Sequence, residues 1–205
     1  GQELNPQTWA VARSDMLILE PEGKDAENIK LGSTLSNDQL ADKRFDFQFV
    51  NPPYGYEWSK DYDAVTTEAA RGFDGRFGAG LPRKSDGQML FLQHFIARMN
   101  DAEDGQSYIG IIMNGSPLFT GGAGSGESEI RRWIMENDWL EAIVALPQQI
   151  FYNTGIGTYI WLLSNRKPAA HRGKVMLVDA SGESFWSGMS KSLGNKRREI
   201  GESHK

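Results

Sequence analysis

The 205-residue sequence predicts an α/β domain with a mostly parallel β-sheet. Short apolar segments alternate with amphipathic ones along the chain, which is the pattern of strands joined by crossover helices. One segment, Tyr108 to Met113, is apolar at nearly every position, as expected of a central strand buried on both faces. The chain is also long enough for one domain with its own core.

Capping and proline signals define the first two elements. Asn5 to Leu19 is predicted to be a helix, because Asn5 can cap it and Pro6 lies in its first turn, where a missing N–H costs nothing. Residues 21–42 are polar and irregular. The aromatic segment Phe45 to Val50 is predicted to be a strand that stops where two consecutive prolines cannot donate to a sheet ladder.

Hydrophobic spacing defines the remaining elements. Residues 55–84 are polar with several glycines, which predicts a functional or mobile loop. Further segments show helical spacing or the short apolar runs of strands. They are the helices Gln88–Met99 and Glu127–Glu136 and the strands Leu140–Ala145, Tyr159–Leu163 and Val175–Val178. One strand near the end is expected to be antiparallel. Residues 181–205 are a polar C-terminal tail, to which we assign no structure.

Composition excludes several classes of function. The chain has no cysteine, so disulfides, thiolate metal sites and a cysteine nucleophile are excluded. The three histidines are scattered, and no metal is expected. A net charge of −5 argues against a protein that grips DNA by itself. No apolar run would span a membrane and no signal-peptide pattern is present, so we expect a cytoplasmic protein without a membrane partner.

The most informative motif is Asn51-Pro52-Pro53-Tyr54, directly after a predicted strand. In open α/β sheets, ligands bind beyond the carboxyl ends of strands. The Asn side-chain oxygen and a proline carbonyl are acceptors with no competing local donor, and the tyrosine ring can stack on a flipped-out base. Two acceptors on an exocyclic amine stabilise the charge that develops when it attacks a methyl donor. Taken alone, the tetrapeptide is equally well explained as a rigid turn that ends a strand.

The context of this motif resembles one family over nearly the whole chain. The matching segments, in order, are Gly1–Pro6, Phe45–Gly55, Asn114–Phe119, Gly124–Arg131 and Tyr152–Trp161. Together they are similar to the modification subunits of type I restriction systems, which are DNA adenine-N6 methyltransferases. The resemblance implies a partial Rossmann-like S-adenosylmethionine-dependent methyltransferase fold with S-adenosylmethionine as cofactor. It implies DNA, a specificity subunit and a motor-nuclease subunit as partners.

The resemblance also implies roles for individual residues. The catalytic and base-binding set is Asn51, Pro52, Pro53 and Tyr54, with Pro53 as a rigid spacer. The implied cofactor-binding set is Glu3, which corresponds to a ribose-binding acid, with Asn5, Ser33 and Thr34. Phe49 or Val50 can pack near the cofactor, but core packing is the favoured use of both. The family's glycine-rich cofactor loop has no counterpart here, so residues 1–180 are expected to be a methyltransferase catalytic domain that lacks this loop and is inactive alone.

Three other segments have weaker signals. In the long loop, Trp58, Lys60, Arg83 and Lys84 are candidates for DNA contacts, although acidic neighbours also make this a solvated loop. The basic cluster of Lys191, Lys196, Arg197 and Arg198 either contacts DNA or a partner subunit, or is solvated. The glycine-rich segment 121–126 lacks the Lys-Ser/Thr ending of a phosphate-binding loop, and we predict a flexible connection with Ser125 as a helix cap.

Two alternative functions stay open. Methyltransferases with an Asn-Pro-Pro-Tyr motif can act on a protein glutamine or on RNA by similar chemistry. A chain without the cofactor loop can also be a catalytically incomplete interaction fragment.

Overall fold

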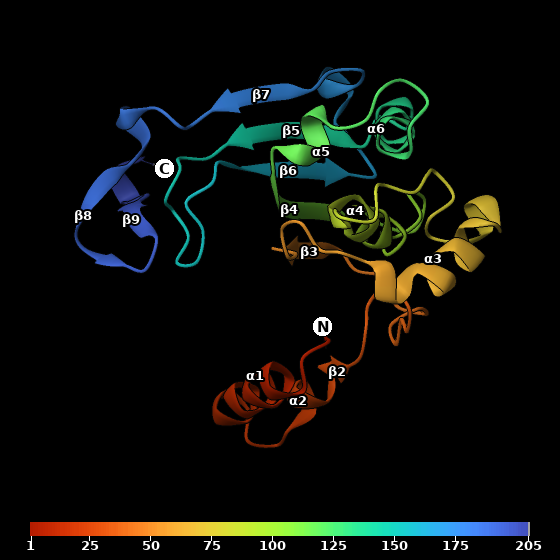
Figure 1. Cartoon of the computed structure of the whole chain (residues 1–205), viewed down its shortest axis with the longest axis horizontal. Helices are drawn as coiled ribbons and strands as arrows, with labels where there is room; N and C mark the ends of the chain where they lie inside the picture. Colours follow the sequence, from red (N-terminus) through yellow and green to blue (C-terminus); the bar gives the residue numbers. More distant parts are fainter. Residues whose placement is uncertain (205) are drawn as a thin grey trace.

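The computed structural model is built around a five-stranded mixed sheet (Figure 1). In spatial order its strands are β3 (Phe47–Val50), β4 (Tyr108–Asn114), β6 (Thr158–Ser164), β5 (Leu140–Ala145) and β7 (Met176–Asp179). Strand β6 runs antiparallel between β4 and β5, and the other four strands run parallel to one another. The prediction of a mostly parallel sheet with an antiparallel strand near the end is confirmed. The structure describes residues 1–204, so Lys205 of the predicted tail lies outside it.

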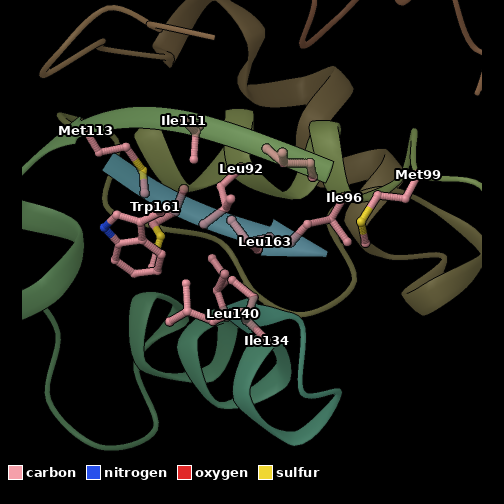
Figure 2. Close-up of a cluster of buried hydrophobic side chains, with 12 residues drawn as sticks. Leu92, Ile96, Met99, Ile111, Met113, Ile134, Leu140, Trp161 and Leu163 are labelled. Atoms are coloured by element: carbon pink, nitrogen blue, oxygen red, sulfur yellow. The ribbon is translucent and has the colours of Figure 1, made fainter. Parts of the chain in front are cut away.

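Two helices cover one face of this sheet, α4 (Gln88–Ile96) and α6 (Gly126–Glu136). Alternate residues of β4 and β6, among them Ile111 and Trp161, point toward these helices and are fully buried. Figure 2 shows Leu92 and Ile134 closing the cluster from the helix side. Each such side chain contributes about 1.5–3 kcal/mol on burial, which makes this cluster the main core.

The opposite face of the sheet carries exposed aromatic residues. Phe47 stacks on Phe49 and on Tyr108, with ring centroids 6.5 and 5.7 Å apart. Phe49 is 80% exposed because it points away from α4, so its predicted place in the core is wrong. Val50, one position on, points to the covered face and packs against the main core.

Residues 55–84 are folded, in contrast to the loop that the sequence predicts. They contain α3 (Tyr62–Ala69) between two 3-10 turns, Ser59–Asp61 and Gly72–Asp74. A second buried cluster forms where this segment meets α4, and its members are Leu35, Trp58, Val65, Phe77 and Leu90. A few large apolar residues spaced among polar ones are therefore enough to anchor the segment.

The N-terminal residues form a small unit beside β3 (Figure 1). Strands β1 (Gln2–Glu3) and β2 (Lys30–Leu31) pair in parallel, next to α1 (Pro6–Leu19) and α2 (Lys24–Glu27). Asn5 caps α1 as predicted, since its side-chain oxygen accepts from the amides of Gln7 and Thr8 at 2.8 and 3.2 Å. Among residues 1–204, no helix has the length and apolar character needed to cross a membrane.

The segment that was predicted to be a tail contains a β-hairpin, β8 (Ser187–Leu193) and β9 (Lys196–Glu199). Gly194 sits in its turn at φ 61°, a conformation that glycine adopts without strain. The Gly-Asn pair at positions 194 and 195 is a hairpin signal that the polar composition of the strands obscured. Short helical turns at Ala169–His171, Glu183–Phe185 and Glu202–His204 complete this part of the chain.

The glycine-rich segment 121–126 is a connection rather than a phosphate loop. It follows the short helix α5 (Ser116–Phe119), and Ser125 caps α6 by accepting from the amide of Ser128 at 3.4 Å. Gly126 passes so close to Leu81 that an added Cβ would overlap the Leu81 carbonyl oxygen, whereas a Cβ on Gly122 would meet nothing within 4 Å.

We therefore expect Gly126→Ala to lower the free energy of unfolding by about 2 kcal/mol, because the backbone at Leu81 has to move. Gly122→Ala is the matched control and should stay within about 0.5 kcal/mol of wild type. Urea denaturation of both variants measures the difference. Equal stabilities would contradict the close approach of α6 to Leu81.

Candidate functional site

A cleft of about 490 Å³ opens between the N-terminal unit and the end of β3. Glu3 at the end of β1 and Thr34 lie on one side, and Asn51, Pro52 and Pro53 lie on the other. The cleft thus brings together predicted site residues that are far apart in the sequence. The other lining residues are Gly1, Gln2, Leu40, Phe45, Phe47, Gln48, Phe49, Val50, Phe91, His94, Phe95 and Arg98.

The motif after β3 has an internal hydrogen bond that the sequence does not reveal. The Tyr54 hydroxyl donates to the side-chain oxygen of Asn51 at 2.8 Å, so the prediction that this oxygen has no competing local donor is wrong. Burial raises the pKa of the Tyr54 phenol, so the phenol keeps its proton and remains a donor. Because an amide oxygen has two lone pairs, Asn51 retains the capacity to accept a second hydrogen bond.

Glu3 offers a carboxylate oxygen at the opposite side of the cleft. The backbone amide of Asn5 donates to Glu3 Oε1 at 2.7 Å and fixes the orientation of the carboxylate. The other oxygen has no hydrogen-bond partner among residues 1–204, which leaves it free to accept from the hydroxyls of a ligand.

Two of the predicted cofactor residues do not line the cleft. The Asn5 side-chain oxygen is used as the cap of α1, so Asn5 contributes through the backbone amide that orients Glu3. The Ser33 hydroxyl donates to Asp61 at 2.7 Å and accepts from the amide of Leu35, so it is engaged inside the fold. Thr34 is the residue of this pair that lies at the cleft.

The predicted DNA contacts divide into buried and exposed residues. Trp58 is 1% exposed and its indole donates to the Arg83 carbonyl at 2.9 Å, so it belongs to the second core and cannot reach DNA. Lys60 is exposed, and the Lys84 ammonium lies 3.5 Å from the centroid of the Tyr62 ring. The Arg83 guanidinium donates to the Ser116 hydroxyl at 2.6 Å, which places it near the carboxyl end of β4.

A buried polar network that the sequence does not predict lies behind the cleft. Arg76 donates to the carbonyl oxygens of Thr34 and Leu35 at 2.7 and 2.9 Å and to the Glu68 carboxylate at 2.6 Å. Asp38 accepts from Arg98, whose side chain lines the cleft. The one signal in the sequence was the four-residue spacing of His94 and Arg98, which places two polar side chains on one side of the predicted helix 88–99. The helix itself ends at Ile96, so Arg98 lies just beyond it.

His94 is the titratable centre of this network. Burial, followed by the positive charge of Arg76, lowers the pKa of His94 to about 4. The neutral ring can therefore accept from the Arg76 guanidinium, whose nitrogen lies 2.9 Å from Nδ1. The arrangement fixes the chain segment that presents Thr34 to the cleft.

Sequence comparison relates the chain to one family. The sequence model described as N-6 DNA Methylase matches residues 1–200. Similar proteins include the type I restriction enzyme HindI methylase subunit of Haemophilus influenzae, 33% identical over 182 residues, and the type I restriction enzyme MjaIX methylase subunit of Methanocaldococcus jannaschii, 29% identical over 181 residues. Both alignments cover 88% of this chain, but 37% and 30% of those proteins. The chain thus spans about a third of the length of these relatives.

Solved structures similar to this chain include a protein of the same kind. The methyltransferase subunit of the type I restriction-modification system from Streptococcus thermophilus matches 100% of this chain and 39% of its own, with a TM-score of 0.78 and 27% identity. A class I S-adenosylmethionine-dependent methyltransferase from Listeria monocytogenes matches 89% of this chain and 49% of its own, with a TM-score of 0.58 and 18% identity, which supports the fold alone. The predicted S-adenosylmethionine-dependent methyltransferase fold is confirmed.

We expect the free energy of unfolding to decrease as the pH is lowered from about 6.5 to about 4.5. The unfolded chain binds a proton at His94 near its ordinary pKa of 6.5, whereas the folded chain resists this proton down to about 4. Stability is therefore complete above pH 6.5 and is lost as the pH falls, by up to about 1.4 kcal/mol per pH unit for one group. Arg76, Asp38, Arg98 and Glu68 are the charged groups that face the ring.

His94→Gln removes this titration, so its stability should vary less between pH 6.5 and 4.5 than that of the wild type. His171→Gln, on an exposed turn, is the matched control and should keep the wild-type dependence. Thermal unfolding at a series of pH values measures the effect. A His94→Gln protein with the wild-type dependence would show that another group is responsible.

Proposed function

Because the chain belongs to the N-6 DNA Methylase family, we propose that it forms part of the catalytic core of a DNA adenine-N6 methyltransferase. The substrate is an adenine flipped out of duplex DNA, and the methyl donor is S-adenosylmethionine. The observation that carries the proposal is the single cleft that contains both the Asn51-Pro52-Pro53 turn and the Glu3 carboxylate.

The turn after β3 is suited to hold the target amine. The Asn51 side-chain oxygen and the Pro52 carbonyl accept the two hydrogens of the exocyclic amine, and the Tyr54 ring stacks on the base. As the nitrogen attacks, positive charge develops on it, and fixed acceptors stabilise that charge more in the transition state than in the ground state. The Tyr54 hydroxyl holds the Asn51 amide in the orientation that presents oxygen.

The other wall of the cleft fits the methyl donor. The free oxygen of Glu3 suits the vicinal hydroxyls of a ribose, and Phe45, Phe49 and Pro53, from the β3 side of the cleft, provide apolar surface for a flat ring. The volume of about 490 Å³ is in the range of cofactor sites. S-adenosylmethionine supplies an electrophilic methyl group when bound. Glu3 and Thr34 would hold the donor in the cleft that Asn51 also lines, and such proximity would lower the barrier to transfer.

The relatives support a proposal about assembly. Those named above are methylase subunits of type I restriction enzymes. We infer that the protein containing this chain works with a specificity subunit that reads the DNA sequence and with a motor-nuclease subunit. The net charge of −5 supports this division of labour, because DNA recognition is delegated to a partner. A cytoplasmic location stays a prediction.

Incubation of the full-length protein with labelled S-adenosylmethionine tests the substrate class. Label is expected on adenine N6 of duplex DNA that contains the recognition site, with the other subunits present. Label on protein glutamine or on RNA would instead support one of the alternative substrates. Absence of transfer to all three, together with intact assembly, would identify an interaction fragment.

Asn51→Ala in the full-length protein is expected to lower the rate of methyl transfer by about 100-fold or more, because the amine loses a fixed acceptor. Its stability should stay within about 0.5 kcal/mol of wild type, since Asn51 is exposed and makes no core contact. Single-turnover methylation and thermal unfolding measure the two quantities. Turnover close to the wild-type value would refute the role of Asn51.

Tyr54→Ala should weaken capture of the flipped base by about 1–3 kcal/mol, the range of base–aromatic stacking. Tyr54→Phe keeps the ring and should keep most of the activity, with a loss of several-fold because Asn51 is no longer oriented (about 1 kcal/mol for one hydrogen bond). Fluorescence of 2-aminopurine at the target position reports base capture. If the Phe variant is as inactive as the Ala variant, the hydroxyl rather than the ring is essential.

A further inference from the structure

The β8–β9 hairpin carries a cluster of exposed or half-exposed cations. We call Trp186 to Glu199 the basic hairpin, and its cations are Lys191, Lys196, Arg197 and Arg198. These fourteen positions contain four basic residues and one acidic residue, a net charge of +3 in a chain of −5. None of the four cations forms an ion pair with a residue of the described chain, whereas Arg76, Arg98 and Lys167 are all paired with carboxylates.

Aromatic rings hold two of these cations in place. The Lys196 ammonium lies 5.0 Å from the centroid of the Tyr152 ring, and the Arg198 guanidinium carbon lies 3.8 Å from that of Trp186. Lys196 and Arg198 occupy alternate positions of β9 and therefore share one side of the strand. Stacking restricts these side chains without neutralising them. Lys191 and Arg197 are exposed.

Backbone hydrogen bonds attach the basic hairpin to the loop between β5 and β6. The amide of Asn195 donates to the Tyr152 carbonyl at 2.8 Å, and the amides of Arg197 and Arg198 donate to the Gln149 carbonyl at 2.9 and 3.2 Å. Gly194 packs directly on the Tyr152 carbonyl, where a Cβ would not fit. The basic hairpin therefore has a defined position on the loop.

This position is at the sheet edge that carries the Asn51 turn. The loop leaves β5 at its carboxyl end, Ala145, and enters β6 at Thr158, which pairs with Asn114 at the carboxyl end of β4. Strand β3 runs parallel to β4, so Asn51 also emerges at this edge. Figure 1 shows the arrowheads of β5 and β7 pointing toward the basic hairpin.

We propose that the basic hairpin binds the sugar-phosphate backbone of duplex DNA beside the base held at Asn51. The position of the duplex beside Asn51 rests on the proposed function, whereas the binding of phosphates by the basic hairpin does not. The rest of the chain has a net charge of −8 (−5 less +3) and repels a polyanion, so a local charge of +3 at the active edge favours one orientation of the duplex. Cations that contact phosphates supply affinity and register without reading sequence.

The test compares Lys191→Gln/Arg197→Gln with wild type in the full-length protein. These two exposed side chains have no packing role, so their replacement removes charge and leaves the fold intact. Arg172→Gln/Lys174→Gln is the matched control, because it removes the same charge between β6 and β7 at the opposite edge of the sheet. The dissociation constant for a duplex is measured by fluorescence anisotropy at several salt concentrations, and methyl transfer to the same duplex is measured in parallel.

Each lost phosphate contact reduces the slope of log affinity against log salt by about 0.9. The hairpin variant should therefore lose nearly two units of slope, equally for specific and unrelated duplexes, and the control none. If the wild type methylates DNA but the hairpin variant has the same salt slope as the wild type, the hairpin proposal alone is overturned. A slope change without any wild-type methyl transfer overturns the proposed function alone. Loss of a partner subunit with an unchanged slope would identify the hairpin as a protein-binding surface and overturn our proposal.

Discussion

The geometry of the cleft depends on one buried guanidinium. Arg76 donates to the backbone carbonyls of Thr34 and Leu35 and to the carboxylate of Glu68 on α3. Its guanidinium also donates to the ring of His94 on α4. Three elements distant in sequence are thereby held against one charge. A buried charge of this kind persists only when all its hydrogen bonds are made, so removal of any partner leaves a strongly penalised group. The wall opposite Asn51 is fixed by this constraint.

The other wall follows from the topology of the sheet. Parallel strands bring their carboxyl ends to one edge, and the two prolines stop β3 there without an unpaired amide donor. The same edge carries Arg83 on Ser116 and the loop to which the β8–β9 hairpin is attached. One rule of sheet construction therefore places Asn51, Arg83 and the basic hairpin at one edge of the five-stranded sheet.

Local pattern was sufficient for the five strands of the central sheet and for α1, α4 and α6, but not for α3 or the β8–β9 hairpin. Strand β5 and helix α6 have the predicted bounds to within one residue, because their apolar spacing and cap are encoded in neighbouring positions. Features that depend on tertiary contacts could not be predicted from local sequence. Phe49 is a large apolar residue of the kind found in cores, yet its burial depends on which face of the sheet is covered. The pairing of Arg76 with Asp38, and the burial of Trp58 by residues of two other segments, depend on tertiary contacts that no local window contains.

The hydrogen bond from Tyr54 to Asn51 has a consequence for chemical selectivity. A carboxamide can rotate by half a turn and exchange its oxygen for its NH2 group, which would offer donors to whatever base arrives. In this structure the phenol donates to the amide oxygen, so the Asn51 side chain is held with its oxygen on the tyrosine side. A purine or pyrimidine that presents a keto oxygen at this position would face another lone pair, whereas adenine presents N–H groups. Under the proposed function, this fixed orientation would favour an amino edge over a keto edge before any nucleobase is bound.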